Sequence, residues 1–396
     1  GADIIQTLCL YGIGDPFSYI SAFATKKYSS IVFAFSTLLR LYFSGIAFIY
    51  MCRYFHHKKQ LSILAGAFCY CFVPYTTWQL TDQTCFLIPF YFFPLFIVGV
   101  NKILNNESPW LYVFTVFFAA TSHFYFFYML ASLTVIYAVI KVFMIYGINI
   151  KAVVFSGVKC VLYAMLSLSM AGLLFFPITY TLLTDPRASM SHLQLLGGLK
   201  GYVKMPMSFI AYIVPLMVVV QFLIGRNVRD KASQKKKILL IILFVLSVCG
   251  FIFPFMSQIV NAFSYATNRW IFAFYLLCAY IVVCELDEIK SIKILSGGVI
   301  LALNILYCVA ITFIKDYGII KISVCHAVIG IFLLIFASDF FYKKTTLPKK
   351  FKSILCFICI VASVFTYNKF DLVKNSTIKT DRVAATLFDN DATKAK

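Results

Sequence analysis

The sequence predicts an all-α protein that crosses a membrane many times. Hydrophobic residues make up 62% of the 396 positions and charged residues only 13%, whereas a soluble domain carries about a quarter charged residues. Apolar stretches close to the roughly 20 residues that a helix needs to cross a bilayer recur along most of the chain. The 43 Phe and 25 Tyr dominate stretches in which a β-barrel strand would alternate polar and apolar residues. We therefore expect a polytopic bundle of transmembrane helices.

The apolar stretches can be placed as about twelve spans in this fragment. They are 30–52, 61–78, 85–101, 109–121, 124–146, 152–181, 206–224, 238–256, 270–284, 294–314, 319–341 and 353–367. Lys and Arg gather in alternate connections, most densely in 226–237 and 342–352, and the positive-inside rule assigns these connections to the cytoplasm. Residues 1–29, the connection 184–205 and the tail beyond 368 are then expected outside.

This map sets the expected domain organisation. Residues 30–367 form the transmembrane module. Residues 1–29 lie outside with no span before them, so we expect them to be the remnant of a first external loop that follows a missing helix. Residues 368–396 turn polar, and we expect an external tail that leads into a further external domain.

Several function classes are not expected. The formal charge of +20 comes from short basic clusters between spans, a distribution that indicates membrane topology and not nucleic-acid binding. Most of the thirteen cysteines lie in apolar spans, where a free Cys packs as a small hydrophobe. The sequence has no P-loop, G-x-S-x-G or H-E-x-x-H motif, so we expect no ATP-driven transport within this chain.

Three polar residues, one within a span and two on a long connection, are candidates for a site. Arg40 lies about halfway along a span, where a cation is costly unless it faces partners or a water-filled cavity. A structural ion pair is the alternative to a site residue. Arg187 and His192 lie on the longest external connection, 184–206, and long loops of this kind often cover a binding cleft. A surface role is the alternative for His192.

Two further stretches enter spans from the external side. In NAFSYATNRWIFAFYLL (261–277), Asn268, Arg269 and Trp270 mark the entry. A cation and an indole there are ordinary interface anchors, whereas an Arg that faces an external pocket would match phosphate oxygens bidentately. HFYFFYML (123–130) is an aromatic run that fits either helix packing or sugar stacking.

Six stretches along residues 1–285 together carry a resemblance to a known family. They are GADIIQTLCLYGIGDPFSYIS, LRLYFSGIAFIYMCRYF, IPFYFFPLFIVGVNKIL, TSHFYFFYMLASLTVIYAVIKVF, FFPITYTLLTDPRAS and NAFSYATNRWIFAFYLLCAYI. In this order they resemble the YfhO family of bacterial membrane proteins, which belongs with the lipid-dependent GT-C glycosyltransferases. The resemblance implies a GT-C-like helical fold and a first external loop with a Gly-rich stretch that ends in Asp, followed by G-[DS]-P-F. Gly1-Ala2-Asp3 and Gly14-Asp15-Pro16-Phe17 fit that spacing.

The resemblance also implies roles for these residues. A first-loop acid serves GT-C enzymes as catalytic base or metal contact, so Asp3 is the first catalytic candidate and Asp15 the second. The chain departs from the family pattern at Gln83, where a His is expected, and at His123, where Asn commonly precedes the aromatic run. Both departures affect the contact that the family is expected to make with its sugar donor. Both residues stay candidates for substrate binding.

The implied activity is sugar transfer on the external face of the bacterial cell membrane. The donor would be a polyprenyl-phosphate sugar and the acceptor a cell-surface glycopolymer such as a teichoic acid, with membrane lipids around the protein and no nucleic acid. A carboxylate would take the acceptor's proton, and Arg40, Arg187 or Arg269 would stabilise the departing phosphate. A divalent metal is left open. The alternatives are a transporter or flippase of a lipid-linked sugar or other anionic substrate, and a non-catalytic membrane scaffold.

Overall fold

The computed structural model describes a large part of the chain. The described residues are 14–25, 27–81, 83–184, 219, 231–263, 266–287, 354, 357, 358, 360–362 and 364. Every regular element among them is a helix. Four of these helices are long and apolar enough to cross a membrane, or five if one bent pair counts as a single span. The all-α membrane fold is confirmed, whereas the count of twelve spans stays a prediction.

The elements follow one another with short connections through the first half of the chain. They are η1 (Ser18–Phe23), α2 (Ser29–Tyr54), α3 (Gln60–Cys71), α4 (Pro74–Thr81), η2 (Thr84–Leu87), α5 (Ile88–Leu104), α6 (Trp110–Ser122), α7 (Phe124–Tyr146), α8 (Ile150–Met170), α9 (Gly172–Thr184), α12 (Lys231–Ile252), α13 (Pro254–Val260) and α14 (Ile271–Asp287). The expected spans 206–224, 294–314 and 319–341, most of 353–367, and the tail 368–396 lie outside the described residues.

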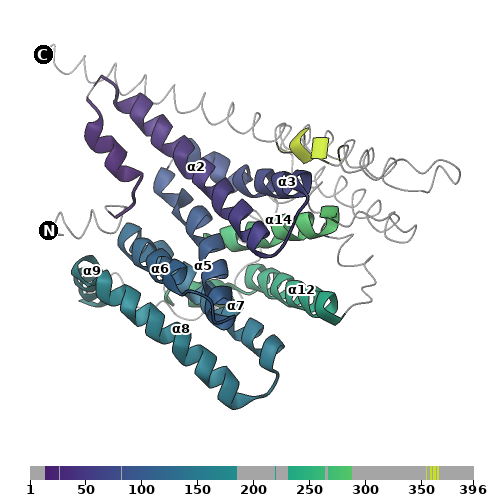
Figure 1. Cartoon of the computed structure of the whole chain (residues 1–396). Coiled ribbons are helices and arrows are strands. Elements are labelled where there is room, and N and C mark those ends of the chain that lie inside the picture. The colour runs from purple at the N-terminus through teal and green to yellow at the C-terminus, as the bar shows by residue number, and fades with distance from the viewer. Residues whose placement is uncertain are drawn as a thin grey trace, which may run out of the picture.

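Helix α5 is the centre of the bundle. It packs against α2, α6 and α7, and Figure 1 shows α2 and α8 on opposite sides of α5 and α6. The apolar window that contains α5 is 89% buried, whereas the corresponding window of α8 is only 11% buried. Helix α8 therefore lies at the periphery. Helix α14 packs mainly against α3 and closes another side of the bundle.

Around Arg40, helix α2 has polar side chains on its inner face and apolar side chains on its outer face. Ser36, Arg40 and Ser44 recur every four residues and are buried, whereas Leu38 and Tyr42 are more than 60% exposed. This pattern is the reverse of that of a soluble amphipathic helix, and it suits a helix whose outer surface meets lipid tails.

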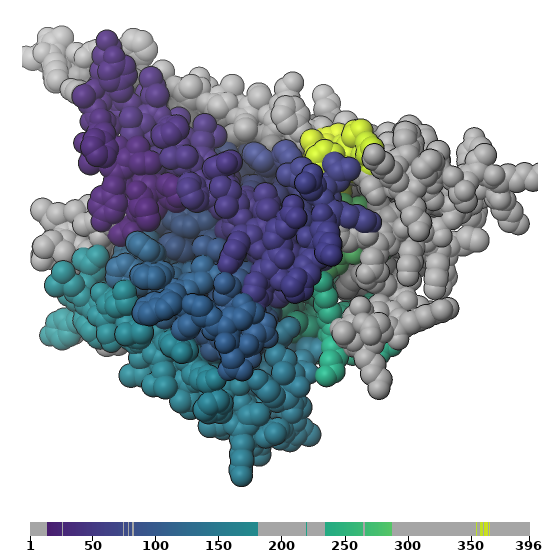
Figure 2. Space-filling view, in the orientation of Figure 1, coloured from purple at the N-terminus to yellow at the C-terminus, as the bar shows by residue number. Residues whose placement is uncertain are grey.

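The outer surface of the described part carries large apolar side chains. On α8 they include Val154, Phe155, Val161, Leu162 and Met165, all more than half exposed. Figure 2 shows α2 and α8 along two edges of the described part. Apolar surface of this extent is unfavourable in water and requires a lipid environment.

Three of the expected spans differ from the helices observed. The expected span 61–78 divides into α3 and α4 ahead of Pro74, and the expected span 238–256 ends at Ile252, after which α13 begins at Pro254 and turns by 106°. Proline lacks the N–H donor and clashes with the preceding turn, so each helix stops before it. The expected span 152–181 divides at Ala171 into α8 and α9. Its first piece, 21 residues long, spans about 30 Å without the second.

Candidate functional site

A buried ion pair connects the N-terminal segment to α2. The Asp15 side chain is fully buried and Arg40 is 4% exposed. The Arg40 Nε donates to Asp15 Oδ2 at 2.9 Å, and Nη2 donates to the same oxygen. The Arg40 Nη1 donates to Ser36 Oγ at 2.7 Å, one turn earlier on α2. The mid-span cation thus faces the protein interior and has a carboxylate partner.

The Asp15 carboxylate is saturated with donors. Besides the two bonds from Arg40, it accepts from Tyr91 Oη at 2.9 Å, from Ser18 Oγ at 3.1 Å and from the Phe17 backbone N–H at 3.2 Å. A carboxylate offers about four lone-pair sites, and these five bonds occupy all of them. This geometry is that of an anchor for the chain, because no lone pair is left to take a proton from a substrate.

The same segment is held closely against the junction of α6 and α7. Ser122 Oγ donates to the Gly14 carbonyl at 3.1 Å, and a Cβ on Gly14 would lie 2.3 Å from the Thr121 carbonyl oxygen. Position 14 therefore requires glycine, because only a residue without a side chain permits so close an approach. The Phe17 ring packs edge-on against the Tyr91 ring at 5.5 Å between centroids. Gly14, Asp15 and Phe17 of the G-D-P-F motif thus each have a structural role.

A second cluster forms around Arg269. Its guanidinium carbon lies 5.0 Å from the centroid of the Phe86 ring and 5.3 Å from that of Tyr125. His123 is buried beside the same two rings, at 6.3 Å from Phe86 and 6.2 Å from Tyr125 between centroids. Three segments that are distant in sequence thus meet here: η2, the α6–α7 junction and the entry to α14.

Asn268 and Trp270 hold the entry to α14 in place. Ser257 Oγ lies 3.4 Å from Asn268 Oδ1, to which it donates, and accepts from Trp270 Nε1 at 3.0 Å. The Trp270 ring is buried and stacks on Phe251 at 4.4 Å between centroids. Trp270 is therefore a packing residue and not an exposed interface anchor. Arg269 lies between these two buried neighbours and is half-buried.

The segment η2 connects the two clusters. Cys85 is close enough to Asp15 and Arg40 to interact with both charges, and the next residue, Phe86, stacks on Arg269. Gln83, the residue just before η2, is exposed. Both clusters belong to the end of the bundle where α5, α7 and α14 begin, which is the end away from the basic connections.

The remaining predicted site residues, Asp3, Arg187 and His192, lie outside the described residues. Tyr91, Phe86 and Tyr125 belong to the clusters, although the sequence did not single them out. A hydroxyl within an otherwise apolar run is a signal for Tyr91, because a buried tyrosine needs a hydrogen-bond partner. Within the described part, no group of three or more His, Cys, Asp or Glu side chains is placed to hold a metal ion.

The fold and these clusters define a helical membrane protein with buried charge at one end of its bundle. The chain belongs to the YfhO family of bacterial membrane proteins, whose family model matches residues 1–394. The match extends the resemblance from residues 1–285 to almost the whole chain. No curated protein and no solved structure matches the chain.

Proposed function

We propose that the chain is a membrane glycosyltransferase of the GT-C type. It moves a sugar from a polyprenyl-phosphate donor to a cell-surface glycopolymer such as a teichoic acid, on the external face of the bacterial membrane. The observation that carries the proposal is the Arg269 cluster, in which a half-buried guanidinium lies over the rings of Phe86 and Tyr125 beside His123. Membership of the YfhO family supports it.

The cluster has the chemistry that a phosphate-linked sugar requires. A guanidinium is planar and carries its donors in a fork that matches phosphate oxygens, and nearby aromatic rings attract its charge. Charge develops on the donor phosphate as the sugar leaves, and a fixed cation in a water-poor site stabilises that charge strongly. The rings of Phe86 and Tyr125 also offer apolar faces to a sugar.

The general base in this proposal is Asp3. It would take the proton of the acceptor hydroxyl as the anomeric carbon is attacked. Asp15 has a supporting role, because its bonds to Arg40 and Tyr91 anchor the external segment that follows Asp3. Arg187 and His192, on the connection 184–206, are proposed to contact the substrate.

The test compares wall glycopolymers from cells that lack the native protein and express full-length variants at equal folded amounts. The sugar substituents are quantified by mass spectrometry. Arg269→Gln and Asp3→Asn are each expected to lower substitution about 100-fold. Lys27→Gln, which removes an exposed cation at the same end of the bundle, is the matched control and should retain normal substitution. Near-normal substitution in both test variants would refute the proposal.

A flippase is the second candidate, and the helix breaks favour it. Helices α3, α8 and α12 each stop and restart at the end away from the basic connections, and transporters use broken helices to build their sites. Purified protein in liposomes separates the two activities. Movement of a fluorescent polyprenyl-phosphate sugar across the bilayer without a change in its mass would indicate a flippase, whereas a new glycan product would indicate a transferase.

A further inference from the structure

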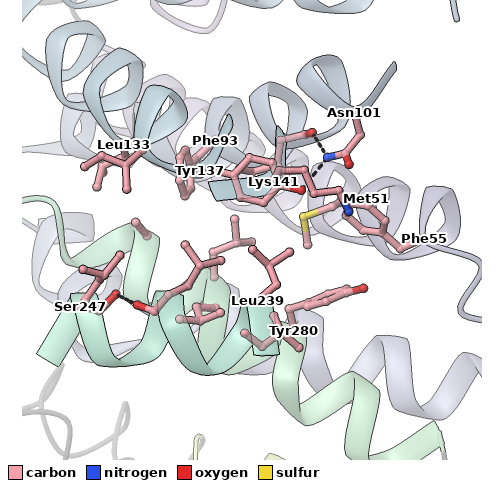
Figure 3. Close-up of a pocket in the computed structure, with 18 of the residues that line it drawn as sticks. Met51, Phe55, Phe93, Asn101, Leu133, Tyr137, Lys141, Leu239, Ser247 and Tyr280 are labelled. Atoms are coloured by element: carbon pink, nitrogen blue, oxygen red, sulfur yellow. Dashed lines mark hydrogen bonds between the residues drawn. The ribbon is translucent and has the colours of Figure 1, made fainter. Parts of the chain in front are cut away.

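A long cavity runs through the bundle from the basic connections to Trp270, next to Arg269 in the sequence. Its volume is about 960 Å³, at the upper end of the range for small-molecule sites. Helices α5 and α7 form one wall, and α12 and α14 form the other. Figure 3 shows Leu133, Phe93 and Tyr137 on the first wall, opposite Ser247 and Leu239 on the second.

The interior of this cavity is apolar. Its lining includes Ile97, Ile136, Leu240, Leu243, Leu246, Leu276 and Leu277. The polar groups in it are bonded within the protein: the Asn101 amide donates to the Tyr137 hydroxyl and to the Ile97 carbonyl, each at 2.7 Å, and Ser247 Oγ donates to the Leu243 carbonyl at 2.8 Å. A ligand in this interior is stabilised by burying its hydrocarbon surface.

The length of the cavity matches one leaflet of a bilayer. On α12 its lining runs from Lys235 to Gly250, a rise of about 22 Å along a helix. The hydrocarbon core of a bilayer is about 30 Å thick, so one leaflet contributes about 15 Å of it. The cavity therefore accommodates the chains of one leaflet together with a headgroup.

One end of the cavity is strongly basic. Arg53, Lys141, Lys235 and Lys236 line it, and Lys141 and Lys236 are close enough to repel each other. Lys236 Nζ also lies 3.2 Å from His57 Nε2, a contact that brings no negative charge to Lys236.

The acid at this end does not balance these charges. Among the described residues that line the cavity, the only carboxylate is that of Glu107, which accepts from Tyr54 Oη at 2.9 Å and from Asn105 at 3.3 Å. Within the described part, Arg53, Lys141 and Lys235 have no ion-pair partner. The cavity thus combines an apolar interior with an excess of cations at one end, which is complementary to an anionic lipid.

We propose that this cavity binds an anionic phospholipid of the cytoplasmic leaflet. The acyl chains lie between α7 and α12, and the phosphate lies between Lys141 and Lys236. The leaflet follows from the positive-inside rule, because Lys235 and Lys236 belong to the basic connection 226–237. The proposed phosphate position is at the opposite end of the bundle from the Arg269 cluster, so this inference does not depend on the proposed glycosyltransferase activity.

The test uses the full-length protein, delipidated in mild detergent and titrated with single lipids under native mass spectrometry. The lipids are palmitoyl-oleoyl phosphatidylglycerol, phosphatidylcholine with the same chains, and a polyprenyl phosphate. Phosphatidylglycerol is expected to bind most tightly. The double variant Lys141→Gln/Lys236→Gln is expected to weaken its binding about 30-fold, because each basic residue near a lipid headgroup contributes about 1 kcal/mol.

Two further variants complete the test. Ser247→Trp fills the apolar interior and should weaken both phospholipids, whereas Lys151→Gln removes an exposed lysine from the same end of the bundle and should change neither. Equal binding of the two phospholipids, tighter binding of the polyprenyl phosphate, or unchanged phosphatidylglycerol binding in the double variant would each overturn the inference. The double variant changes only half-buried side chains, so its result stands even if Ser247→Trp does not fold.

Discussion

Replacement of Asp15 by Asn should destabilise the protein strongly. The substitution keeps the shape of the side chain but removes the negative charge that faces Arg40, which is 4% exposed. It also places an amide donor or a neutral oxygen where Arg40 Nε and Nη2 now donate to Oδ2. Loss of one partner of a buried ion pair costs about 3–5 kcal/mol, and we expect Asp15→Asn to fall in this range.

Arg40→Met should cost less than Asp15→Asn. It leaves the carboxylate with three of its donors, namely Tyr91, Ser18 and the Phe17 backbone N–H. The double variant Asp15→Asn/Arg40→Met should lose less stability than the sum of the losses in the two single variants, because no charged group is then buried without its partner. The expected coupling free energy is about 2 kcal/mol, which lies within the range for residues in direct contact.

The free energy of unfolding can be measured by denaturing titration of the purified protein in micelles, followed by tryptophan fluorescence. Asp15→Asn within about 0.5 kcal/mol of wild type, the range of neutral surface changes, would show that the ion pair does not anchor the segment. A variant of unchanged stability that has lost glycan modification would instead assign Asp15 to the chemistry.

Three shorter predictions follow from other contacts. Tyr91→Phe should cost about 1.5–3 kcal/mol in the same titration, because it removes a donor to a buried carboxylate, whereas Tyr42→Phe, at a position 65% exposed, should be neutral. Gly66→Ala should destabilise by about 1–3 kcal/mol, since its Cβ would meet an α14 side chain at 2.3 Å, whereas Gly157→Ala, with nothing within 4 Å, should stabilise by up to about 1 kcal/mol. Lys236→Cys, in a background without native cysteines, should resist an impermeant thiol reagent applied to intact cells. Labelling of this cysteine would show that the topology is the inverse of the one expected.

The sequence predicted the need for a partner at Arg40 but not the partner itself. A cation halfway along an apolar helix is unfavourable in lipid, so the helix must turn that face inward, as Ser36 and Ser44 also do. Its partner, Asp15, lies 25 residues earlier, and no periodicity relates the two positions. The pairing depends on how the N-terminal segment folds back onto α2 and α5.

The helix breaks and the basic cavity were not predicted, for two physical reasons. A hydropathy window sums side-chain polarity, so a proline such as Pro74 or Pro254 at the end of an apolar run does not alter the sum although it stops the helix. Leucines that line a cavity, such as Leu243, have the same composition as leucines that fill a core. Only the spacing of α7 and α12 in three dimensions distinguishes the two.

Helix α14 contributes to both proposed sites, and we expect the two sites to act independently. Arg269 lies two residues before α14 begins at Ile271. Tyr280, over whose ring Lys236 Nζ lies at 5.0 Å, is 11 positions after Arg269, about 16 Å of helical rise. At that separation the two cationic side chains make no direct contact. Arg269→Gln should therefore leave phosphatidylglycerol binding intact, and Lys141→Gln/Lys236→Gln should leave the phosphate chemistry at Arg269 intact. A loss of both functions in either variant would mean that α14 moves as a unit when one site is emptied.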